Sequence, residues 1–262
     1  MDLQLTSKTA LVTGSTAGIG LAIAQRLAAE GAAVIITGRT QARIDDARAA
    51  ILKETPQASV RGVAVDFGDV AQVDNLLREV PTVDMLINNV GIFEPKPFAE
   101  IPDADWLRFF EVNVLSGVRL ARQYFPLMLE QNAGRIIFIS SESALQIPAE
   151  MIQYGTTKTA QLAVARGLAE LTKGSAVTVN SVLPGPTASE GVEEFLKQLA
   201  GAGKTREEAE HEFFRDARPS SLLQRFITPE EVANMVAYLC SPLAAATNGA
   251  SVRVDGGVVR SI

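Results

Sequence analysis

The sequence contains very little cysteine and histidine, and this limits the chemistry that it can support. Cys240 is the only cysteine among 262 residues, so no disulfide can form within the chain. A reducing compartment, the cytoplasm, is the expected location. His211, the only histidine, stands among glutamates and is expected to be solvated rather than catalytic. No group of residues has the spacing of metal ligands, so we expect no metal.

Long hydrophobic runs and blocks of basic residues are also missing. No uninterrupted apolar stretch is long enough to cross a bilayer, and the first residues are typical of the approach to a strand rather than of a signal peptide. The net charge is −6, from 24 Lys and Arg against 30 Asp and Glu. We therefore expect neither a nucleic acid nor a membrane surface as a partner. Hydrophobic residues make up 47% of the chain, enough for a sizeable core.

Short apolar segments alternate with helical patterns along the whole chain. The expected strands, rich in Val and Ile, are Thr9–Thr13, Ala33–Thr37, Val60–Val65, Met85–Asn88, Arg135–Ser140, Val177–Leu183 and Ser251–Asp255. The helical patterns are Ile19–Glu30, Arg43–Glu54, Ala71–Glu79, Trp106–Gln131, Gln153–Thr172 and Glu230–Leu239. Strands that are apolar throughout indicate a parallel sheet covered on both faces. The alternation predicts a doubly wound α/β fold in one domain, residues 1–262.

A glycine-rich turn follows the first expected strand. Thr9–Thr13 leads directly into Gly14-Ser-Thr-Ala-Gly18-Ile-Gly20 and then into an apolar helical stretch. Glycine lets the backbone approach a pyrophosphate, and a helix N-terminus offers it free N–H groups. The order of strand, turn and helix therefore predicts a nucleotide-binding site, although the spacing is T-G-x-x-x-G-x-G rather than the common G-x-G-x-x-G.

Tyr154 and Lys158 lie four residues apart within an apolar helical pattern, so they share one helix face. A neighbouring cation favours the phenolate and is expected to lower the pKa of the phenol from its usual value of about 10. A phenol with a lowered pKa can transfer a proton near neutral pH.

These motifs together resemble the short-chain dehydrogenase/reductase family, over essentially the whole chain. Asn88-Asn89-Val90-Gly91 is similar to the family's N-N-A-G, with Val90 in place of alanine, and Asn180-Ser-Val-Leu-Pro184-Gly185 is similar to N-x-V-x-P-G. The resemblance implies a Rossmann-type doubly wound parallel sheet flanked by helices. It also implies an NAD(P)(H)-dependent oxidoreductase that interconverts a carbonyl and a secondary alcohol.

The resemblance assigns four catalytic residues. Ser141, thirteen positions before Tyr154, would hydrogen-bond the substrate oxygen in preference to the serines on either side of it. Tyr154 would donate the proton during reduction, and Lys158 would hold the nicotinamide ribose. Asn113 would anchor a water molecule that relays protons.

The residue after the second expected strand bears on the choice of cofactor. NAD-preferring proteins have an acid there, which hydrogen-bonds the ribose hydroxyls. Here Gly38 is followed by Arg39, whose planar guanidinium can pair with a 2′-phosphate. We therefore favour NADP(H), while NAD(H) stays open because Ala17 replaces the basic residue of many NADP-dependent relatives. Asp66 is similar to the family's adenine-binding acid; its alternative role is a helix N-cap, which Asp69 could supply instead.

The resemblance implies a cofactor site made from several segments. Pro184-Gly185-Pro186-Thr187 would bend the chain beneath the nicotinamide, and the Thr187 backbone and the Ser189 hydroxyl would meet its carboxamide. The expected set is Gly14, Ser15, Thr16, Gly18, Ile19, Gly20, Arg39, Asp66, Phe67, Asn88, Val90, Gly91, Tyr154, Lys158, Pro184, Gly185, Thr187 and Ser189.

The polar segment from Thr187 to Phe226 interrupts the alternation of strands and helices. At the carboxyl edge of the sheet it is expected to form a helical lid over the active site, with a surface decoration as the alternative. The expected substrate pocket is lined by Val90, Glu142, Leu145, Ile147, Ile152 and Gln153, and closed by Phe195, Phe213 and Phe214.

These features predict a reductase for a ketone or other 3-oxo compound with an apolar body. Sugars, steroids, terpenoid ketones and diketones stay open. An acyl-carrier-protein thioester is less expected, because Glu130 and Glu170 stand where such relatives usually carry basic residues. The alternatives are a non-catalytic NADP-binding regulator or scaffold, and an epimerase or dehydratase, which usually extends further than Ile262. The resemblance implies a homotetramer, or else a dimer, assembled through Trp106–Gln131 and Gln153–Thr172.

Overall fold

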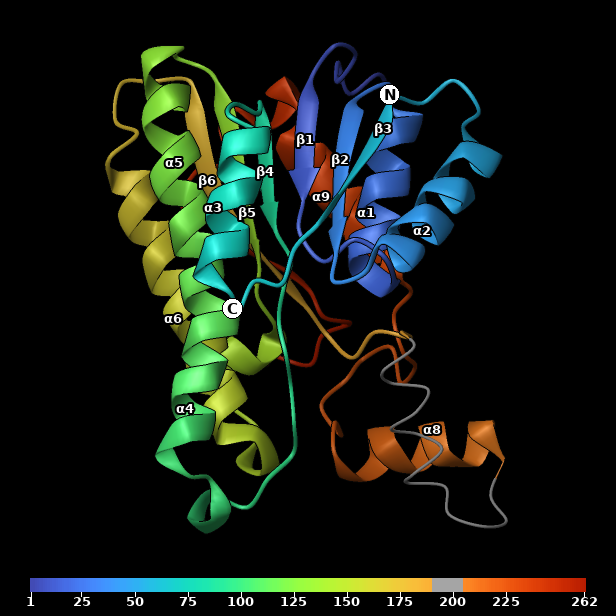
Figure 1. Ribbon diagram of the computed structural model, residues 1–262. Helices are drawn as coiled ribbons and strands as arrows, with labels where there is room; N and C mark the ends of the chain where they lie inside the picture. The colour runs from blue at the N-terminus through green and yellow to red at the C-terminus, as the bar shows by residue number, and fades with distance from the viewer. Residues whose placement is uncertain (190–204) are drawn as a thin grey trace.

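Seven parallel strands form one sheet in the order β3-β2-β1-β4-β5-β6-β7 (Figure 1). The computed structural model describes residues 1–189 and 205–262. The strands are β1 (Thr9–Val12), β2 (Ala33–Gly38), β3 (Val60–Ala64), β4 (Met85–Asn88), β5 (Gly134–Ile139), β6 (Val177–Pro184) and β7 (Ser251–Val254). The chain runs outward from β1 in one direction and then returns to build the other half from β4, which is the doubly wound arrangement. The predicted fold class is confirmed, and each strand ends within one residue of its predicted bounds.

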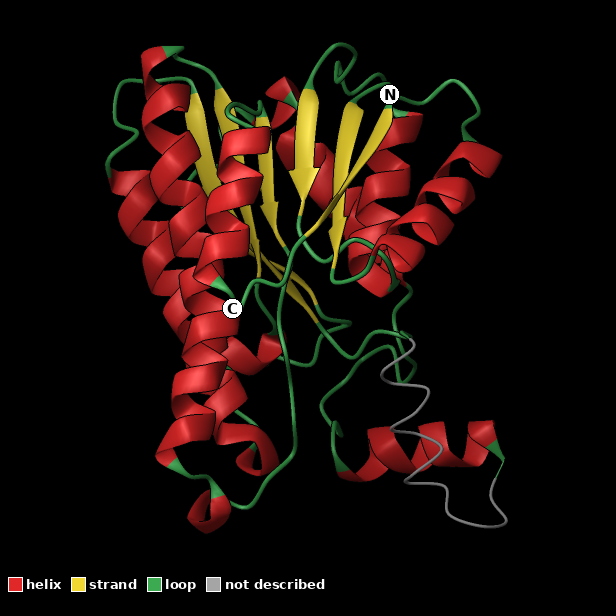
Figure 2. Cartoon of the chain, viewed as in Figure 1, coloured by secondary structure: helices red, strands yellow, loops and turns green. Residues whose placement is uncertain are grey.

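Helices cover both faces of the sheet (Figure 2). The helices packed on one face are α1 (Gly18–Ala29), α2 (Gln41–Glu54) and α9 (Pro229–Cys240); those on the other are α3 (Val70–Glu79), α5 (Ser116–Glu130) and α6 (Ile152–Glu170). Strand β1 contributes to both cores, because Ala10 and Val12 pack on the first face and Leu11 packs on the second. Side chains alternate across a strand, so a strand buried on both sides must be apolar throughout.

The predicted helix Trp106–Gln131 is interrupted in the structure. It consists of α4 (Asp103–Phe110), a π-helical turn at Glu111–Leu115, and α5. The turn contains Asn113, whose side chain is held by hydrogen bonds to residues outside the helix. Such π-helical turns often occur at functional sites. An apolar repeat cannot reveal this turn, because the contacts that accompany it come from distant parts of the chain.

The described part of the predicted lid segment, residues 187–189 and 205–226, lies beyond the carboxyl ends of the strands. Within it the structure describes α8 (Arg206–Asp216), which stands apart from the sheet in Figure 1. A capping box between Thr205 and Glu208 begins this helix. Phe213, Phe214 and Phe226 pack together with ring centroids 5.1 Å apart, so α8 has a small apolar core of its own. Phe195 lies outside the described residues.

None of the helices in the described part of the chain is both long enough and apolar enough to cross a membrane.

Candidate active site

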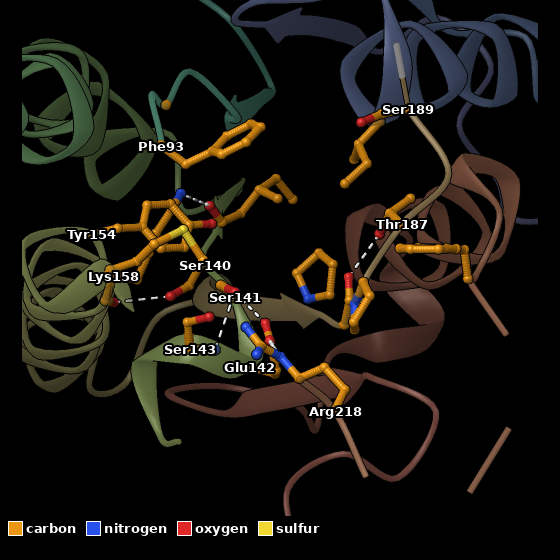
Figure 3. Close-up of a pocket in the computed structure, with 18 of the residues that line it drawn as sticks. Phe93, Ser140, Ser141, Glu142, Ser143, Tyr154, Lys158, Thr187, Ser189 and Arg218 are labelled. Atoms are coloured by element: carbon orange, nitrogen blue, oxygen red, sulfur yellow. Dashed lines mark hydrogen bonds and ion pairs between the residues drawn. The ribbon is translucent and has the colours of Figure 1, made fainter. Parts of the chain in front are cut away.

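A cavity of about 300 Å³ opens at the carboxyl edge of the sheet. Its walls come from segments far apart in the sequence: the start of α1, the loop after β4, the loop after β5, helix α6, the loop after β6 and the end of α8. Figure 3 shows Ser141, Glu142, Tyr154 and Lys158 on one side of this cavity and Thr187 and Ser189 on the other. In open α/β sheets ligands bind at this edge, at the point where the strand order reverses.

The glycine turn is fastened to β2 by side chains within it. Ser15 is fully buried; its hydroxyl donates to the carbonyl oxygen of Val12 (2.7 Å) and accepts from the N–H of Thr37 (2.9 Å). The hydroxyl of Thr37 in turn accepts from the N–H of Gly14 (3.0 Å). Gly14 has φ +61°, a conformation that favours glycine. The side chain of Ser15, predicted to bind cofactor, therefore holds the turn in shape.

Asn89 connects the glycine turn to the loop after β4. Its side-chain amide donates to the carbonyl oxygens of Thr13 (2.9 Å) and Gly14 (3.1 Å), and the residue lines the cavity. The sequence prediction named the neighbouring Asn88 instead. Asn88 is buried outside the cavity lining, and its side-chain amide has no hydrogen-bond partner within residues 1–189 and 205–262. The tandem asparagines were a signal for this site, but they do not distinguish the two positions.

Ser141 is the serine after β5 whose hydroxyl meets the predicted proton donor. It is hydrogen-bonded to Tyr154, donates to the carboxylate of Glu142 and accepts from the N–H of Ser143 (3.1 Å). The hydroxyl of Ser140 instead donates to the backbone carbonyl of Lys158 (2.9 Å). The geometry therefore agrees with the choice of Ser141 over Ser140.

Tyr154 and Lys158 share one face of α6, as predicted. The Lys158 ammonium lies 5.6 Å from the centroid of the Tyr154 ring and donates to the carbonyl oxygen of Ile139 (2.9 Å). The expected lowering of the tyrosine pKa is wrong. Burial raises the pKa of Tyr154, the Glu142 carboxylate raises it further, and the hydrogen bond with Ser141 only partly opposes them. Burial also lowers the pKa of Lys158 to about 8.

Asn113 joins three parts of the site from the π-helical turn. Its side-chain oxygen accepts from the N–H of Ile92 (2.7 Å), and its amide donates to the carbonyl of Ile92 and to the hydroxyl of Thr157 (both 3.0 Å). Its own backbone carbonyl accepts from the side chain of Gln161. Asn113 is buried and lies next to the helix face that carries Lys158. Its role as the anchor of a water molecule stays a prediction.

Arg39 is exposed at the carboxyl end of β2 and has no hydrogen bond or ion pair with any residue that the structure describes. Gly38, the residue before Arg39, lets Thr16 of the glycine turn pack closely against the end of β2, since a Cβ at Gly38 would lie 2.5 Å from Cγ2 of Thr16. Asp66 is also exposed, and its carboxylate accepts from the N–H of Gly68 (2.9 Å). Asp69 caps α3 by accepting from Ala71 and Gln72, so the N-cap role belongs to Asp69 and not to Asp66.

The cavity wall contains a buried ion pair that the sequence did not predict. Arg218, just after α8, donates from Nε to Oε1 of Glu142 (3.1 Å), and the two side chains are only 9% and 6% exposed. Arg218 also donates to Glu150 (3.4 Å) and to the backbone carbonyl of Ala217 (2.8 Å). Glu142 was predicted as a pocket residue. Nothing in the sequence around Arg218 marks this residue as the partner of Glu142.

The substrate pocket differs from the predicted one in several residues. Glu142 and Phe213 line the cavity as expected. Leu145 and Ile147 do not, because their side chains are about half exposed on the outer surface. The remaining predicted residues that lie outside the lining are Val90, Ile152, Gln153 and Phe214. Apolar side chains that do line the cavity include Phe93, Pro95, Met151 and Phe226.

The sequence model for the short chain dehydrogenases matches residues 8–200 of the chain. The chain belongs to this family. It is 50% identical to the uncharacterized oxidoreductase YvaG of Bacillus subtilis and 32% identical to the 3-oxoacyl-[acyl-carrier-protein] reductase FabG of Aquifex aeolicus, over at least 98% of each chain. The crystal structure of L-sorbose reductase from Gluconobacter frateurii, complexed with NADPH and L-sorbose, superposes over the full length of both chains with a TM-score of 0.94 at 30% identity.

The predicted cofactor residues of this short-chain dehydrogenase fall into two groups. Those in the cavity lining are Ile19, Gly91, Tyr154, Lys158, Pro184, Gly185, Thr187 and Ser189. Those outside it are Gly14, Ser15, Thr16, Gly18, Gly20, Arg39, Asp66, Phe67, Asn88 and Val90. The second group comes from the glycine turn and the ends of β2, β3 and β4. A dinucleotide extends across two such halves of the fold, with its nicotinamide in one and its adenosine in the other.

Proposed function

We propose that the chain is an NADP(H)-dependent reductase that converts a ketone or other 3-oxo compound into a secondary alcohol, and can run the reverse reaction. The observation that carries this proposal is the meeting of Ser141, Tyr154 and Lys158 in one cavity. Ser141 and Tyr154 are hydrogen-bonded to each other, and the ammonium of Lys158 lies over the tyrosine ring. These groups supply a hydrogen-bond donor, a proton donor and a cation at one place.

Ser141, Tyr154 and Lys158 each have a separate role in the proposed reduction. When bound, NADPH supplies the hydride that adds to the carbonyl carbon. The Ser141 hydroxyl donates a hydrogen bond to the substrate oxygen, and Tyr154 transfers its phenolic proton to that oxygen, which completes the alcohol. The raised pKa keeps the Tyr154 phenol protonated at neutral pH, as a donor requires. Lys158 then stabilises the resulting phenolate by its positive charge.

The preference for NADP(H) rests on Arg39 and on the shape of the cofactor site. The exposed guanidinium of Arg39, without a partner among the described residues, can form paired hydrogen bonds with a 2′-phosphate. The similar L-sorbose reductase was solved with NADPH, which supports the same choice. Lys158 and the loop Pro184–Thr187 would hold the nicotinamide end, and the glycine turn would receive the pyrophosphate.

Assembly into a homotetramer, with a dimer as the alternative, is part of the proposal. Leu107 is 71% exposed on α4 and Leu115 is 38% exposed just before α5, in the helical stretch predicted to pair with a second copy. Light scattering coupled to size-exclusion chromatography tests this assembly, and a monomer would contradict it. The cytoplasmic location stays a prediction from the sequence.

A panel of ketones tests the activity. We expect loss of NADPH absorbance with at least one class among simple ketones, hydroxyketones, diketones, 3-oxo esters and keto sugars, and slower loss of NADH. Binding of NADPH without turnover across the panel would favour the alternative of a regulator or scaffold.

A further inference from the structure

Glu142 and Arg218 place a buried pair of polar groups beside the serine that is to bind the substrate oxygen. Glu142 is 4% exposed and Arg218 is 8% exposed, and both line the cavity. We propose that this pair selects a neutral ketone with a hydroxyl group next to the carbonyl, as in a hydroxyketone or a ketose. The inference rests on the proposed function and names the substrate class of that same site.

The hydrogen bond between Ser141 and Glu142 carries the argument. The Ser141 hydroxyl donates its only proton to Oε2 of Glu142. A hydroxyl has one proton, so Ser141 must release Glu142 when it donates to the substrate carbonyl. The Oε2 atom then loses a partner while the side chain stays buried. A buried acceptor without a donor is unfavourable, and more so when it is charged. A substrate hydroxyl next to the carbonyl would supply the missing donor.

Arg218 supplies hydrogen-bond donors that complement the acceptor of Glu142. Its Nε donates to Glu142 and its Nη1 donates to Glu150 and Ala217. Its Nη2 donates to no residue that the structure describes. The Nη2 protons are therefore free to donate to a substrate hydroxyl oxygen. The guanidinium carbon of Arg218 lies 5.8 Å from the centroid of the Phe213 ring, and both residues line the cavity. Figure 3 shows Arg218 reaching Glu142. A hydroxyl group both donates and accepts, so it can satisfy Glu142 and Arg218 together.

The charges around Arg218 disfavour an anionic substrate. Two carboxylates, those of Glu142 and Glu150, lie against this one guanidinium, so its positive charge is already matched. A substrate carboxylate placed at the same position would meet a carboxylate within a few ångströms, and like charges disfavour one another. A plain ketone would avoid repulsion but would leave Glu142 without its donor. Sites built for a substrate hydroxyl reject analogues that lack it by large factors for this reason.

Three four-carbon compounds isolate the group that the pair would recognise. 1-Hydroxybutan-2-one, butan-2-one and 2-oxobutanoate share a ketone and differ only in the neighbouring carbon, which is CH2OH, CH3 or a carboxylate. With NADPH and the full-length protein, we expect kcat/KM for 1-hydroxybutan-2-one to exceed both others by about 100-fold or more. Equal or higher kcat/KM for butan-2-one or 2-oxobutanoate would overturn the inference and leave the proposed reductase intact.

Substitutions test whether Glu142 and Arg218 cause the preference for 1-hydroxybutan-2-one over butan-2-one. Glu142→Gln keeps the shape but removes the charge, and we expect the ratio of kcat/KM for 1-hydroxybutan-2-one over butan-2-one to fall at least tenfold. Arg215→Met, at the end of α8 but exposed and paired with Asp216, is the control and should change the ratio less than twofold. An unchanged ratio in Glu142→Gln would overturn the inference.

A second variant guards against loss of folding. Removing Arg218 alone leaves a buried carboxylate, so the double change Glu142→Gln with Arg218→Met removes both charges together. We expect it to bind NADPH and to lose the selectivity for 1-hydroxybutan-2-one; retained selectivity would overturn the inference. If wild-type protein binds NADPH but reduces no ketone of the wider panel, the proposed function fails, and this inference fails with it.

Discussion

The Lys158 ammonium lies 5.6 Å from the centroid of the Tyr154 ring, in a site buried enough to change the pKa of both groups. Burial raises the pKa of the phenol and lowers that of the ammonium to about 8. Both shifts favour the uncharged forms. The site therefore holds a protonated phenol beside a lysine that loses its charge within the accessible pH range.

The affinity for NADPH is expected to depend on pH through Lys158. Its folded pKa of about 8 lies below the unfolded value of about 10.4, so the folded protein loses this proton first as the pH rises. The hydrogen bond that Lys158 would donate to the cofactor then changes from charged to neutral, and the affinity for NADPH should fall roughly three- to tenfold between pH 7 and pH 9.5. Fluorescence titration measures this dependence. An affinity that stays flat up to pH 10 would contradict it, and Lys158→Met should bind weakly at every pH.

Ser141→Ala should reduce kcat by about 100-fold and leave the dissociation constant of NADPH within threefold. The variant removes the hydroxyl that is hydrogen-bonded to Tyr154 and that would donate to the substrate oxygen, and loss of one such donor costs about 2.7–4 kcal/mol. Ser143→Ala is the matched control and should cost less than tenfold, since only its backbone N–H contacts Ser141. If Ser143→Ala were the more damaging change, the assignment of Ser141 would be wrong.

Arg39→Ala should weaken NADPH binding by about tenfold or more and change NADH binding less than twofold. The expected loss is that of a charge-assisted pair between the guanidinium and the 2′-phosphate, which NADH lacks. The control is Arg48→Ala, because Arg48 is also an exposed arginine but lies further along the chain, on α2. Parallel titrations with both cofactors give the answer, and equal losses for NADPH and NADH would remove Arg39 from the phosphate site.

Gly20→Ala should destabilise the protein and abolish tight NADPH binding. The added Cβ would overlap the carbonyl oxygen of Gly14 and lie 2.5 Å from Nδ2 of Asn89, so the first turn of α1 would have to move from the glycine turn. We expect the free energy of unfolding in urea to fall by about 1–3 kcal/mol, as for other overpacked sites. Gly68→Ala, whose Cβ would lie 3.3 Å from Oδ1 of Asp66 and 4.0 Å from Cγ2 of Val112, should change this free energy by less than about 1 kcal/mol. Equal losses of unfolding free energy in Gly20→Ala and Gly68→Ala would contradict the close packing of α1 against the glycine turn.

The sheet could be predicted almost completely because each strand is apolar throughout and bounded by polar turns. Short-range patterns also offered Asp69, as an alternative to Asp66, for the cap of α3, and placed Tyr154 and Lys158 on one helix face. These features depend on residues within a few positions of one another. The order and spacing of the family motifs then brought Ser141 into the same site.

The features that escaped prediction depend on contacts between distant residues. The π-helical turn involves bonds from Asn113 to Ile92 and Thr157, which an apolar repeat does not encode. The pKa of Tyr154 moves opposite to the prediction because a cation four residues away is visible in the sequence, whereas burial is not. Arg218 reaches Glu142 across 76 residues, from a segment with no regular pattern.

The most direct test of the account compares Tyr154→Phe with the wild type, using loss of NADPH absorbance with the best ketone and fluorescence titration of NADPH. Phenylalanine keeps the ring beneath Lys158 and removes only the hydroxyl group, whose proton is to be transferred. The account predicts an NADPH dissociation constant within threefold of the wild type and a kcat lowered by about 100-fold or more. A variant that binds NADPH equally well and reduces the ketone at the wild-type rate would contradict the role of Tyr154 as proton donor.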